Sequence, residues 1–362
     1  MTKALALLSG GLDSTLAIEV IKRQGIEVEA LNIVTSFCRC TAAGSCKLEA
    51  IKVSEKLNVP IKVINSTKDM LEIIKKPKFG FGKNINPCID CRINLFRAAG
   101  KYMREIDASF IFTGEVLGQR PMSQRKEAMR KIDSEADLTG YVLRPLCAKH
   151  MEPTIPEKEG LVDREKLLSI KGRSRKEQFQ LADIFEIKDY RCPAGGCALT
   201  DPEYAHRMRD LMKYSDPSVN DVNLLNVGRH FRVDPKTKII MGRRDEDNTR
   251  LESLAKESDL VFFMEKIQGP LAILRGELTD ANIQLAASMI ASYSKEQDQS
   301  VASVKVMTKG DEEGGRVLSV APKNMDEIRA MMIKKPLKKS VSKSIDKRQD
   351  SSNTKCDQPV SV

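Results

Sequence analysis

The sequence predicts an α/β fold, with a parallel sheet that carries helices on both faces, followed by a small α+β domain and a disordered basic tail. Short apolar runs alternate with amphipathic helical patterns over residues 3–113, as in parallel sheets with crossover helices. A length of 362 residues predicts about two domains. Residues 334–362 hold half of the net charge of +10 and are poor in aliphatic residues, which favours disorder.

The first elements alternate regularly between strand and helix. Residues 3–8 are apolar and end at Ser9-Gly10-Gly11, after which Leu12, Leu16 and Ile21 recur at helical spacing. The next elements expected along the chain are a strand at 26–34, a helix at 47–57, a strand at 61–64, a helix at 95–106 and a strand at 109–113. Ligands of such sheets bind at the carboxyl ends of the strands. Residues 9–14 and 113–115 fall at such ends.

A run of turn-forming residues at 215–221 follows a predicted helix at 202–214 and marks a domain boundary. Beyond it, we expect hairpin strands at 229–233 and 238–241, a helix that opens at 242–248, strands at 260–263, 271–274, 304–307 and 317–320, and a short helix after Pro322. The predicted division of the chain is 1–214, 222–300, 301–333 and 334–362.

Composition excludes several classes of protein. No apolar run approaches the roughly 20 residues that span a bilayer, and the N-terminus lacks a secretion signal. We therefore expect a cytoplasmic protein without a membrane partner, in which nine cysteines serve as metal ligands or redox nucleophiles and not as disulfides. The basic tail either solubilises the chain or holds RNA weakly.

The turn between the first strand and the first helix is the strongest signal in the chain. Adjacent glycines let the backbone approach a ligand, and the helix start offers free N–H groups, which together suit a pyrophosphate. Asp13 is placed to hold a magnesium ion on the phosphates. The expected phosphate ligands are Ser9, Gly10, Gly11, Asp13, Ser14 and Thr15. The loop lacks the Gly-Lys-Ser/Thr ending of the Walker motif, which argues against a kinase or GTPase.

Cysteines recur in close sets: Cys88 with Cys91 at a helix start, Cys192 with Cys197 in a glycine-rich loop, and Cys38, Cys40 and Cys46 after the second strand. Three interpretations remain open. The thiolates hold zinc, they hold an iron–sulfur cluster with one iron free for sulfide, or Cys88 or Cys91 carries a persulfide with a resolving cysteine nearby. We expect Cys88, Cys91, Cys192 and Cys197, together with Asp13, to be the catalytic residues, and the four cysteines to be the metal ligands.

The run Ser9-Gly10-Gly11-Leu12-Asp13-Ser14 resembles the motif of the PP-loop, or N-type, ATP pyrophosphatases. The resemblance implies an adenine nucleotide alpha hydrolase-like fold. It also implies ATP cleavage between the α and β phosphates, adenylation of an oxygen, and displacement by a nitrogen or sulfur nucleophile. All six positions match the motif, but the motif does not determine which substrate the enzyme acts on.

Asn86-Pro87-Cys88, with Thr113-Gly114 at the end of a later strand, resembles the tRNA thiouridylases of that superfamily. This resemblance implies that Thr113 and Gly114 contact ATP and that a Cys-x-x-Cys pair with a distant cysteine holds a four-iron four-sulfur cluster, zinc being the alternative. The family commonly has histidine where this chain has Glu115. The implied partners are tRNA and a sulfur donor: sulfide, a cysteine desulfurase or a sulfur carrier.

Residues 227–276 resemble the NFACT-type RNA-binding domain, through Gly228-Arg229-His230-Phe231-Arg232 and Gly242-Arg243-Arg244-Asp245. Either a phosphate-contacting face or an ordinary charged surface is expected from Arg229, Arg232, Lys236, Lys238, Arg243 and Arg244. The whole pattern predicts a tRNA sulfurtransferase that thiolates a uridine through an adenylated base. The alternatives are a PP-loop enzyme that acts on a small molecule and a non-catalytic RNA-binding protein.

Overall fold

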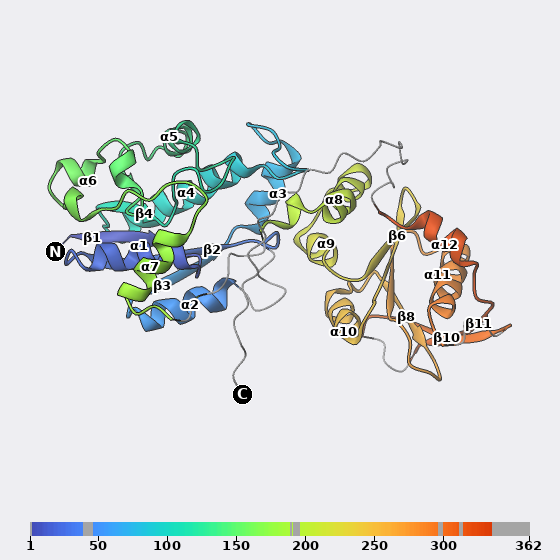
Figure 1. Ribbon diagram of the computed structural model, residues 1–362. Helices are drawn as coiled ribbons and strands as arrows, with labels where there is room; N and C mark the ends of the chain where they lie inside the picture. Colours follow the sequence, from blue (N-terminus) through green and yellow to red (C-terminus); the bar gives the residue numbers. More distant parts are fainter. Residues whose placement is uncertain are drawn as a thin grey trace, which may run out of the picture.

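The computed structural model describes residues 2–38, 46–188, 190, 196–295, 300–310 and 314–334. In its N-terminal half the described strands form one parallel sheet in the order β3-β2-β1-β4-β5 (Figure 1). The strands are β1 (Lys3–Leu7), β2 (Glu27–Val34), β3 (Ile61–Asn65), β4 (Phe110–Thr113) and β5 (Val142–Leu143). The strand order reverses at β1, so β1 and β4 end side by side at the position where such sheets bind ligands.

Helices cover both faces of this sheet, as the sequence predicts. The helices α1 (Leu12–Lys22), α2 (Cys46–Lys56) and α7 (Lys176–Ile184) pack into one apolar core, and α4 (Cys88–Glu105) and α5 (Lys126–Glu135) pack into the core on the opposite face. The alternating short apolar runs therefore identified the fold class correctly. The predicted helix at 95–106 begins earlier, at Cys88, because the first turn after Pro87 carries few apolar residues and leaves no periodic signal.

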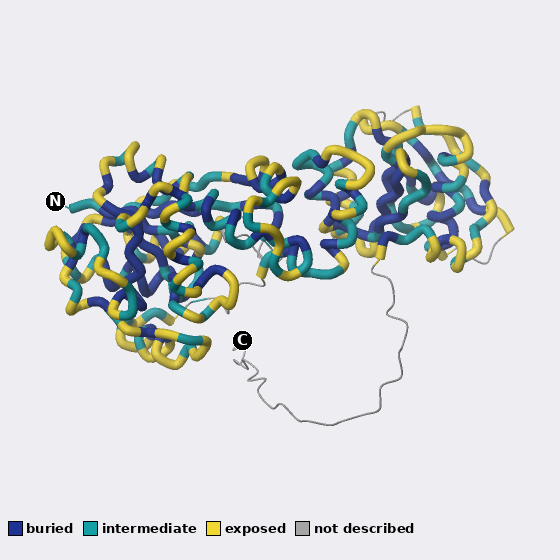
Figure 2. Tube along the Cα trace, turned by 90° about the horizontal axis from the view of Figure 1, so that it is seen from above, coloured by how far each residue is buried: buried dark blue, intermediate teal, exposed yellow. Residues whose placement is uncertain are grey.

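A third apolar cluster links the two halves of the molecule. It joins α3 (Thr67–Lys75) to α8 (Pro202–Tyr214) and α9 (Val219–Leu224) through buried side chains such as Phe37, Met70 and Leu211. Figure 1 shows these helices between the two sheets, and Figure 2 shows a buried core on either side of them.

The C-terminal half contains an antiparallel sheet in the order β11-β10-β8-β9-β7-β6. Its strands are β6 (Arg229–Asp234), β7 (Thr237–Met241), β8 (Leu260–Met264), β9 (Ala272–Arg275), β10 (Ala302–Thr308) and β11 (Arg316–Val320). On one face lies α10 (Asp245–Leu254), and on the other lie α11 (Asp280–Ser292) and α12 (Met325–Met331).

The strands expected within 301–333 are present, but they do not form a separate layer. β10 pairs with β8 from Val304 opposite Met264 to Thr308 opposite Leu260, so this segment extends the same sheet. The basic tail beyond residue 334 lies outside the described residues. Within the described part of the chain, no helix combines the length and apolarity needed to cross a membrane.

Candidate active site at the ends of β1 and β4

The predicted phosphate loop joins β1 to α1 and is tightly enclosed. Gly10 has a φ of +77°, and a Cβ there would lie 2.8 Å from the backbone nitrogen of Ala50, so no other residue fits this turn. Gly11 stands before α1 without a side-chain cap, which leaves the N–H groups of the helix start for a ligand. The hydroxyls of Ser14 and Thr15 donate to the carbonyl oxygen of Gly11, at 2.8 and 3.1 Å.

The end of β4 lies directly against this loop. A Cβ on Gly114 would stand 2.4 Å from the carbonyl carbon and oxygen of Asp13. Thr113 pairs with Leu7 in the sheet, and its hydroxyl accepts a hydrogen bond from the backbone N–H of Glu115 at 3.0 Å. The structure thus brings Thr113 and Gly114 to the loop that begins at Ser9.

Two side chains that the sequence analysis did not connect with the loop hold its carboxylate. Gln119 donates to Asp13 Oδ2 at 3.0 Å, and Arg175 forms an ion pair with Asp13 Oδ1 at 3.3 Å. Their segments meet because the N–H of Gly172 donates to the carbonyl of Leu117 at 2.7 Å. Arg175 stands in a strongly charged stretch, where charge density alone does not distinguish a loop contact from a solvated surface.

Arg120 connects the phosphate loop with the first cysteine pair. The pKa of Arg120 is lowered first by removal of water and then by neighbouring Arg92, whereas Cys88, Glu115 and Asp13 act in the opposite direction. The charges of Asp13 and Cys88, which are far apart in the sequence, therefore both act on this guanidinium.

Glu115, at the position where the related family has histidine, belongs to a buried ionic network. Its carboxylate pairs with Arg144 at 3.1 Å and with Arg92 at 3.4 Å, and Arg144 also binds both carboxylate oxygens of Asp133 at 2.8 Å. Glu115 and Arg144 are 4% and 3% exposed. Breaking one partner of such a network leaves a buried charge uncompensated. The network fixes β4, β5 and α4 relative to one another.

Three separate segments bring cysteines together beside α4. Cys38 and Cys197 face each other in an isolated β-bridge, and the N–H of Ala198 donates to the carbonyl of Phe37 at 2.8 Å. Asn84, shortly before Cys88, donates to the carbonyl of Thr200 at 2.7 Å. The charges that act on the thiol of Cys91 include those of Cys88, Cys38 and Cys197. Cys38, for which the sequence analysis assigned no role, therefore belongs to this group.

The environment of these thiols is apolar. Burial raises the pKa of Cys91 to about 12 and that of Cys197 to about 11, and Arg92 partly opposes the shift at Cys91. Both pack against the apolar cluster that contains Phe37 and Tyr204. Among the described residues, no three cysteine, histidine or acidic side chains stand at the spacing of a metal site. Cys192, which was expected among the ligands, lies outside the described residues, as does Cys40.

Five of the six basic residues expected to contact RNA line two pockets at the junction of the halves, and Arg244 lines neither. Arg232, Lys236 and Lys238 line one pocket, and Arg229 and Arg243 line the other together with Arg207 of α8. Arg207 was missed because α8 precedes the predicted boundary at 215–221. Charge pairing satisfies part of this face: Arg232 binds Asp210 at 2.6 Å and Lys236 binds Glu277 at 2.5 Å.

Comparison with known proteins gives two family matches. The model of the thiamine biosynthesis protein (ThiI) family matches residues 1–156, and that of the NFACT protein RNA binding domain matches residues 228–332. A tRNA-specific 2-thiouridylase, MnmA 2 of Clostridium botulinum, is 28% identical over 165 residues, which cover 43% of this chain and 46% of the relative. MnmA of a Synechococcus species is 30% identical over 149 residues, 39% and 42% of the two chains. The chain thus spans less than half the length of these curated relatives.

Two solved structures have partial similarity to the chain. A 4-thiouridine synthetase in complex with RNA and ATP is 23% identical over 51% of this chain and 52% of its own, with a TM-score of 0.33. The U34-tRNA thiolase NcsA of Methanococcus maripaludis is 17% identical over 62% and 73% of the two chains, with a TM-score of 0.32. The family matches carry the assignment: the chain joins a PP-loop thiouridylase-like domain, matched over residues 1–156, to an NFACT-type RNA-binding domain, matched over residues 228–332.

Proposed function

We propose that this chain is a tRNA sulfurtransferase that uses ATP to adenylate a uridine and then replaces the activated oxygen with sulfur. The observation that carries the proposal is the link between the start of α4, which holds Cys88 and Cys91, and the phosphate loop: Arg92 pairs with Glu115 at 3.4 Å, and the preceding Gly114 packs against the backbone of Asp13. The match of residues 1–156 to the ThiI family and the 2-thiouridylase relatives support the same reaction.

The loop and the residues around it bind the triphosphate. Backbone N–H groups at the start of α1 take the pyrophosphate oxygens, and the hydroxyls of Ser14 and Thr15 would leave the carbonyl oxygen of Gly11 to donate to the phosphates, together with that of Ser9. Asp13 is bound to Gln119 and Arg175 in the structure. Asp13 is the residue that would hold a magnesium ion on the phosphates, and Arg175 would then be free to neutralise phosphate charge. Fixed positive charge at the leaving pyrophosphate is the main catalytic contribution.

The reaction has two displacement steps. A carbonyl oxygen of uracil attacks the α phosphorus, the bond to the β-phosphate oxygen breaks, and pyrophosphate leaves. A sulfur nucleophile presented beside Cys88 and Cys91 then attacks the activated ring carbon, and AMP leaves with the original oxygen. Activation comes first because an unactivated carbonyl oxygen is a poor leaving group. Arg120, between the loop and Cys88, stabilises the negative charge that develops in both steps.

The cysteine group suits a soft metal by its donor chemistry, because Cys38 and Cys197 face each other in a β-bridge and Cys91 packs against the same apolar cluster as Cys197. We propose Cys88, Cys91 and Cys197 as ligands of a four-iron four-sulfur cluster. Cys192 is the alternative to Cys197 as the distant ligand, and zinc is the alternative to the cluster. Such a cluster supplies an iron site that binds sulfide. Iron, zinc and sulfide analysis of anaerobically purified protein distinguishes the three interpretations. About four irons per chain supports the cluster, and about one zinc supports a structural site. The absence of both metals supports a persulfide.

The ATP half of the proposal has its own test. We expect the full chain to release pyrophosphate and AMP from ATP when tRNA is present, and Asp13→Asn to lower the rate of release at least about a hundredfold. Lys176→Gln, an exposed change next to Arg175, is the matched control and retains the rate. Release that is equally fast without tRNA contradicts RNA as the substrate and favours a small-molecule acceptor.

A further inference from the structure

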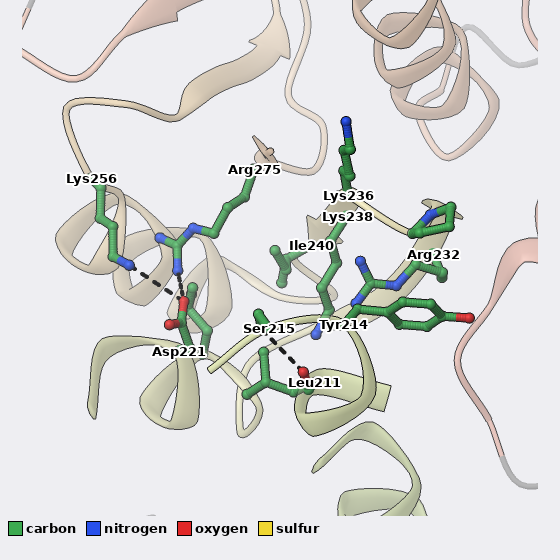
Figure 3. Close-up of a pocket in the computed structure, with 12 residues that line it drawn as sticks. Leu211, Tyr214, Ser215, Asp221, Arg232, Lys236, Lys238, Ile240, Lys256 and Arg275 are labelled. Carbon is green, nitrogen blue, oxygen red and sulfur yellow. Dashed lines mark hydrogen bonds and ion pairs between the residues drawn. The ribbon is translucent and has the colours of Figure 1, made fainter. Parts of the chain in front are cut away.

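A pocket of about 200 Å³ lies where α8 and α9 meet the C-terminal sheet, away from the phosphate loop (Figure 3). Apolar side chains form part of its wall, from Leu211 of α8, Leu224 of α9 and Ile240 of β7. The remaining lining is mostly basic, from Arg232, Lys236, Lys238, Lys256 and Arg275. A cavity of this size admits a phosphate group or a similar anion.

Four of these five cations already have acidic partners. Arg232 binds Asp210 through two nitrogens, and Arg275 binds Asp259 in the same way and also contacts Asp221 at 2.5 Å. Lys256 pairs with Asp221 at 3.5 Å, as Figure 3 shows, and Lys236 pairs with Glu277. These pairs hold the cations in place around the pocket and leave little net charge on them.

Lys238 is different from the other four. Its residue is 8% exposed, and within the described parts of the chain its ammonium makes no hydrogen bond or ion pair. Figure 3 shows its side chain extending from β7 into the pocket, toward Leu211 and Tyr214 of α8. Removal of most of its surrounding water makes the charged form of Lys238 costly, and an anion bound in the pocket would offset that cost.

The charge around Lys238 is nearly balanced. Burial is the first cause that lowers the pKa of Lys238, to about 7, and Arg232 and Arg207 add to it, whereas Asp210 and Asp221 oppose it. The titratable or charged groups that act on Lys238 or line the pocket with it are Arg207, Asp210 and Tyr214 of α8, Asp221 of α9, His230 and Arg232 of β6, Lys236 of the turn before β7, Lys256 before β8, and Arg275 of β9.

We propose that this pocket binds a phosphate group of the RNA backbone and that Lys238 is the direct donor to it. The proposal rests on the proposed function, because it takes the bound RNA to be the substrate of the phosphate-loop site. The segment that contains β6, β7 and β9 matches an RNA-binding domain. Tyr214 lies at the pocket with the Arg232 guanidinium 4.7 Å from its ring centre, and an aromatic ring there suits stacking of an adjacent base.

Binding at this pocket couples RNA affinity to a proton. A phosphate beside Lys238 stabilises the ammonium and raises its pKa in the complex, whereas the free protein releases that proton near pH 7. RNA affinity is therefore highest below about pH 7. Above that pH, affinity falls by up to tenfold per unit, because each binding event must take up one proton.

The test compares Lys238→Met with Lys266→Met in the full chain, by titration with unmodified tRNA between about pH 6 and pH 8.5. Lys266 is the matched control, since it is exposed and lines neither pocket. We expect Lys238→Met to weaken tRNA binding at least about tenfold near pH 6, to lower the salt slope by about 0.7 to 0.9, and to abolish the pH dependence. Lys266→Met retains that dependence.

Two further measurements separate a loss of binding from a loss of folding, and free phosphate from RNA as the ligand. Lys238→Met removes an unpaired buried charge, so it unfolds at no lower temperature than the parent protein. Inorganic phosphate at millimolar concentration competes with tRNA if the pocket recognises the phosphate alone. If inorganic phosphate does not compete, the pocket recognises the polynucleotide and not the phosphate group alone. The inference is overturned if the parent protein binds tRNA equally at all these pH values, or if Lys238→Met binds as tightly as Lys266→Met. A parent protein that binds no tRNA contradicts the proposed function itself.

Discussion

The residues of the phosphate loop were identified from sequence because their constraints are local. Two glycines, two hydroxyls and a carboxylate within six residues carry the whole pattern, and Gly10 has the positive φ that the turn requires. Gln119, Arg120 and Arg175 were not linked to the loop, because the contacts that distinguish them depend on how segments 117–124 and 171–175 fold together.

Gly114 gives a prediction about the packing of β4 on the loop. We expect Gly114→Ala to destabilise the protein by about 1–3 kcal/mol, since the added Cβ meets backbone atoms of Asp13 at 2.4 Å that have no room to move. Gly11→Ala is the comparison, because the nearest atom to its added Cβ is the hydroxyl of Ser9 at 3.6 Å. Denaturant unfolding measures both, and equal stabilities of the two variants would show that β4 does not press on the loop.

The buried imidazole of His230 should make the free energy of unfolding depend on pH. Its imidazole is fully buried and donates to the carbonyl of Val227 at 2.9 Å, and burial, followed by Lys238 and Arg207, places its pKa well below 6.5. Because the unfolded chain takes up the proton near pH 6.5 and the folded chain does not, stability is lost as pH falls below that value. The loss is about 1.4 kcal/mol per unit.

His230→Gln removes this titration, so the difference in unfolding free energy between pH 7.5 and pH 5.5 should be smaller in the variant by about 1.4 kcal/mol. His206→Gln, on α8, controls for the loss of a histidine elsewhere. An unchanged pH dependence in His230→Gln would mean that the buried imidazole becomes protonated without cost.

At the scale of elements, periodicity predicted strands better than it predicted the contacts between segments. The first strand and helix were placed nearly to the residue, because apolar runs end at unmistakable turn residues. The pairing of the segment after β2 with the segment before α8 has no sequence signal, since it consists of a single bridge between Cys38 and Cys197. For that reason the sequence analysis left the role of Cys38 open.

Phe37 anchors that pairing. Its side chain is 1% exposed and packs edge-on against Tyr204, with ring centres 6.4 Å apart. We expect Phe37→Ala to cost about 3–5 kcal/mol of unfolding free energy. We also expect it to make Cys197 react faster with an alkylating reagent, because the bridge beside it loosens. Phe81→Ala, at a residue 44% exposed, is the control. Unchanged alkylation of Cys197 would show that Phe37 does not hold the two segments together.

For the whole molecule, the sequence predicted both halves but not how they join. The turn-rich run at 215–221 suggested a clean boundary, whereas the apolar cluster of α3, α8 and α9 extends across it. An amphipathic pattern predicts that a helix buries one face, but it does not predict which other element that face packs against. The consequence is functional: α8 contributes Leu211 and Tyr214 to a pocket whose cations come from the C-terminal sheet.

The most direct measurement of the central claim is the transfer of labelled sulfur into tRNA, followed together with pyrophosphate release from ATP. The account predicts that Asp13→Asn loses both activities, and that Cys91→Ser and Cys197→Ser keep ATP- and tRNA-dependent pyrophosphate release but transfer no sulfur. Sulfur incorporation by both cysteine variants at the rate of the parent protein would contradict the account, because the loop and the thiols would then not serve one reaction.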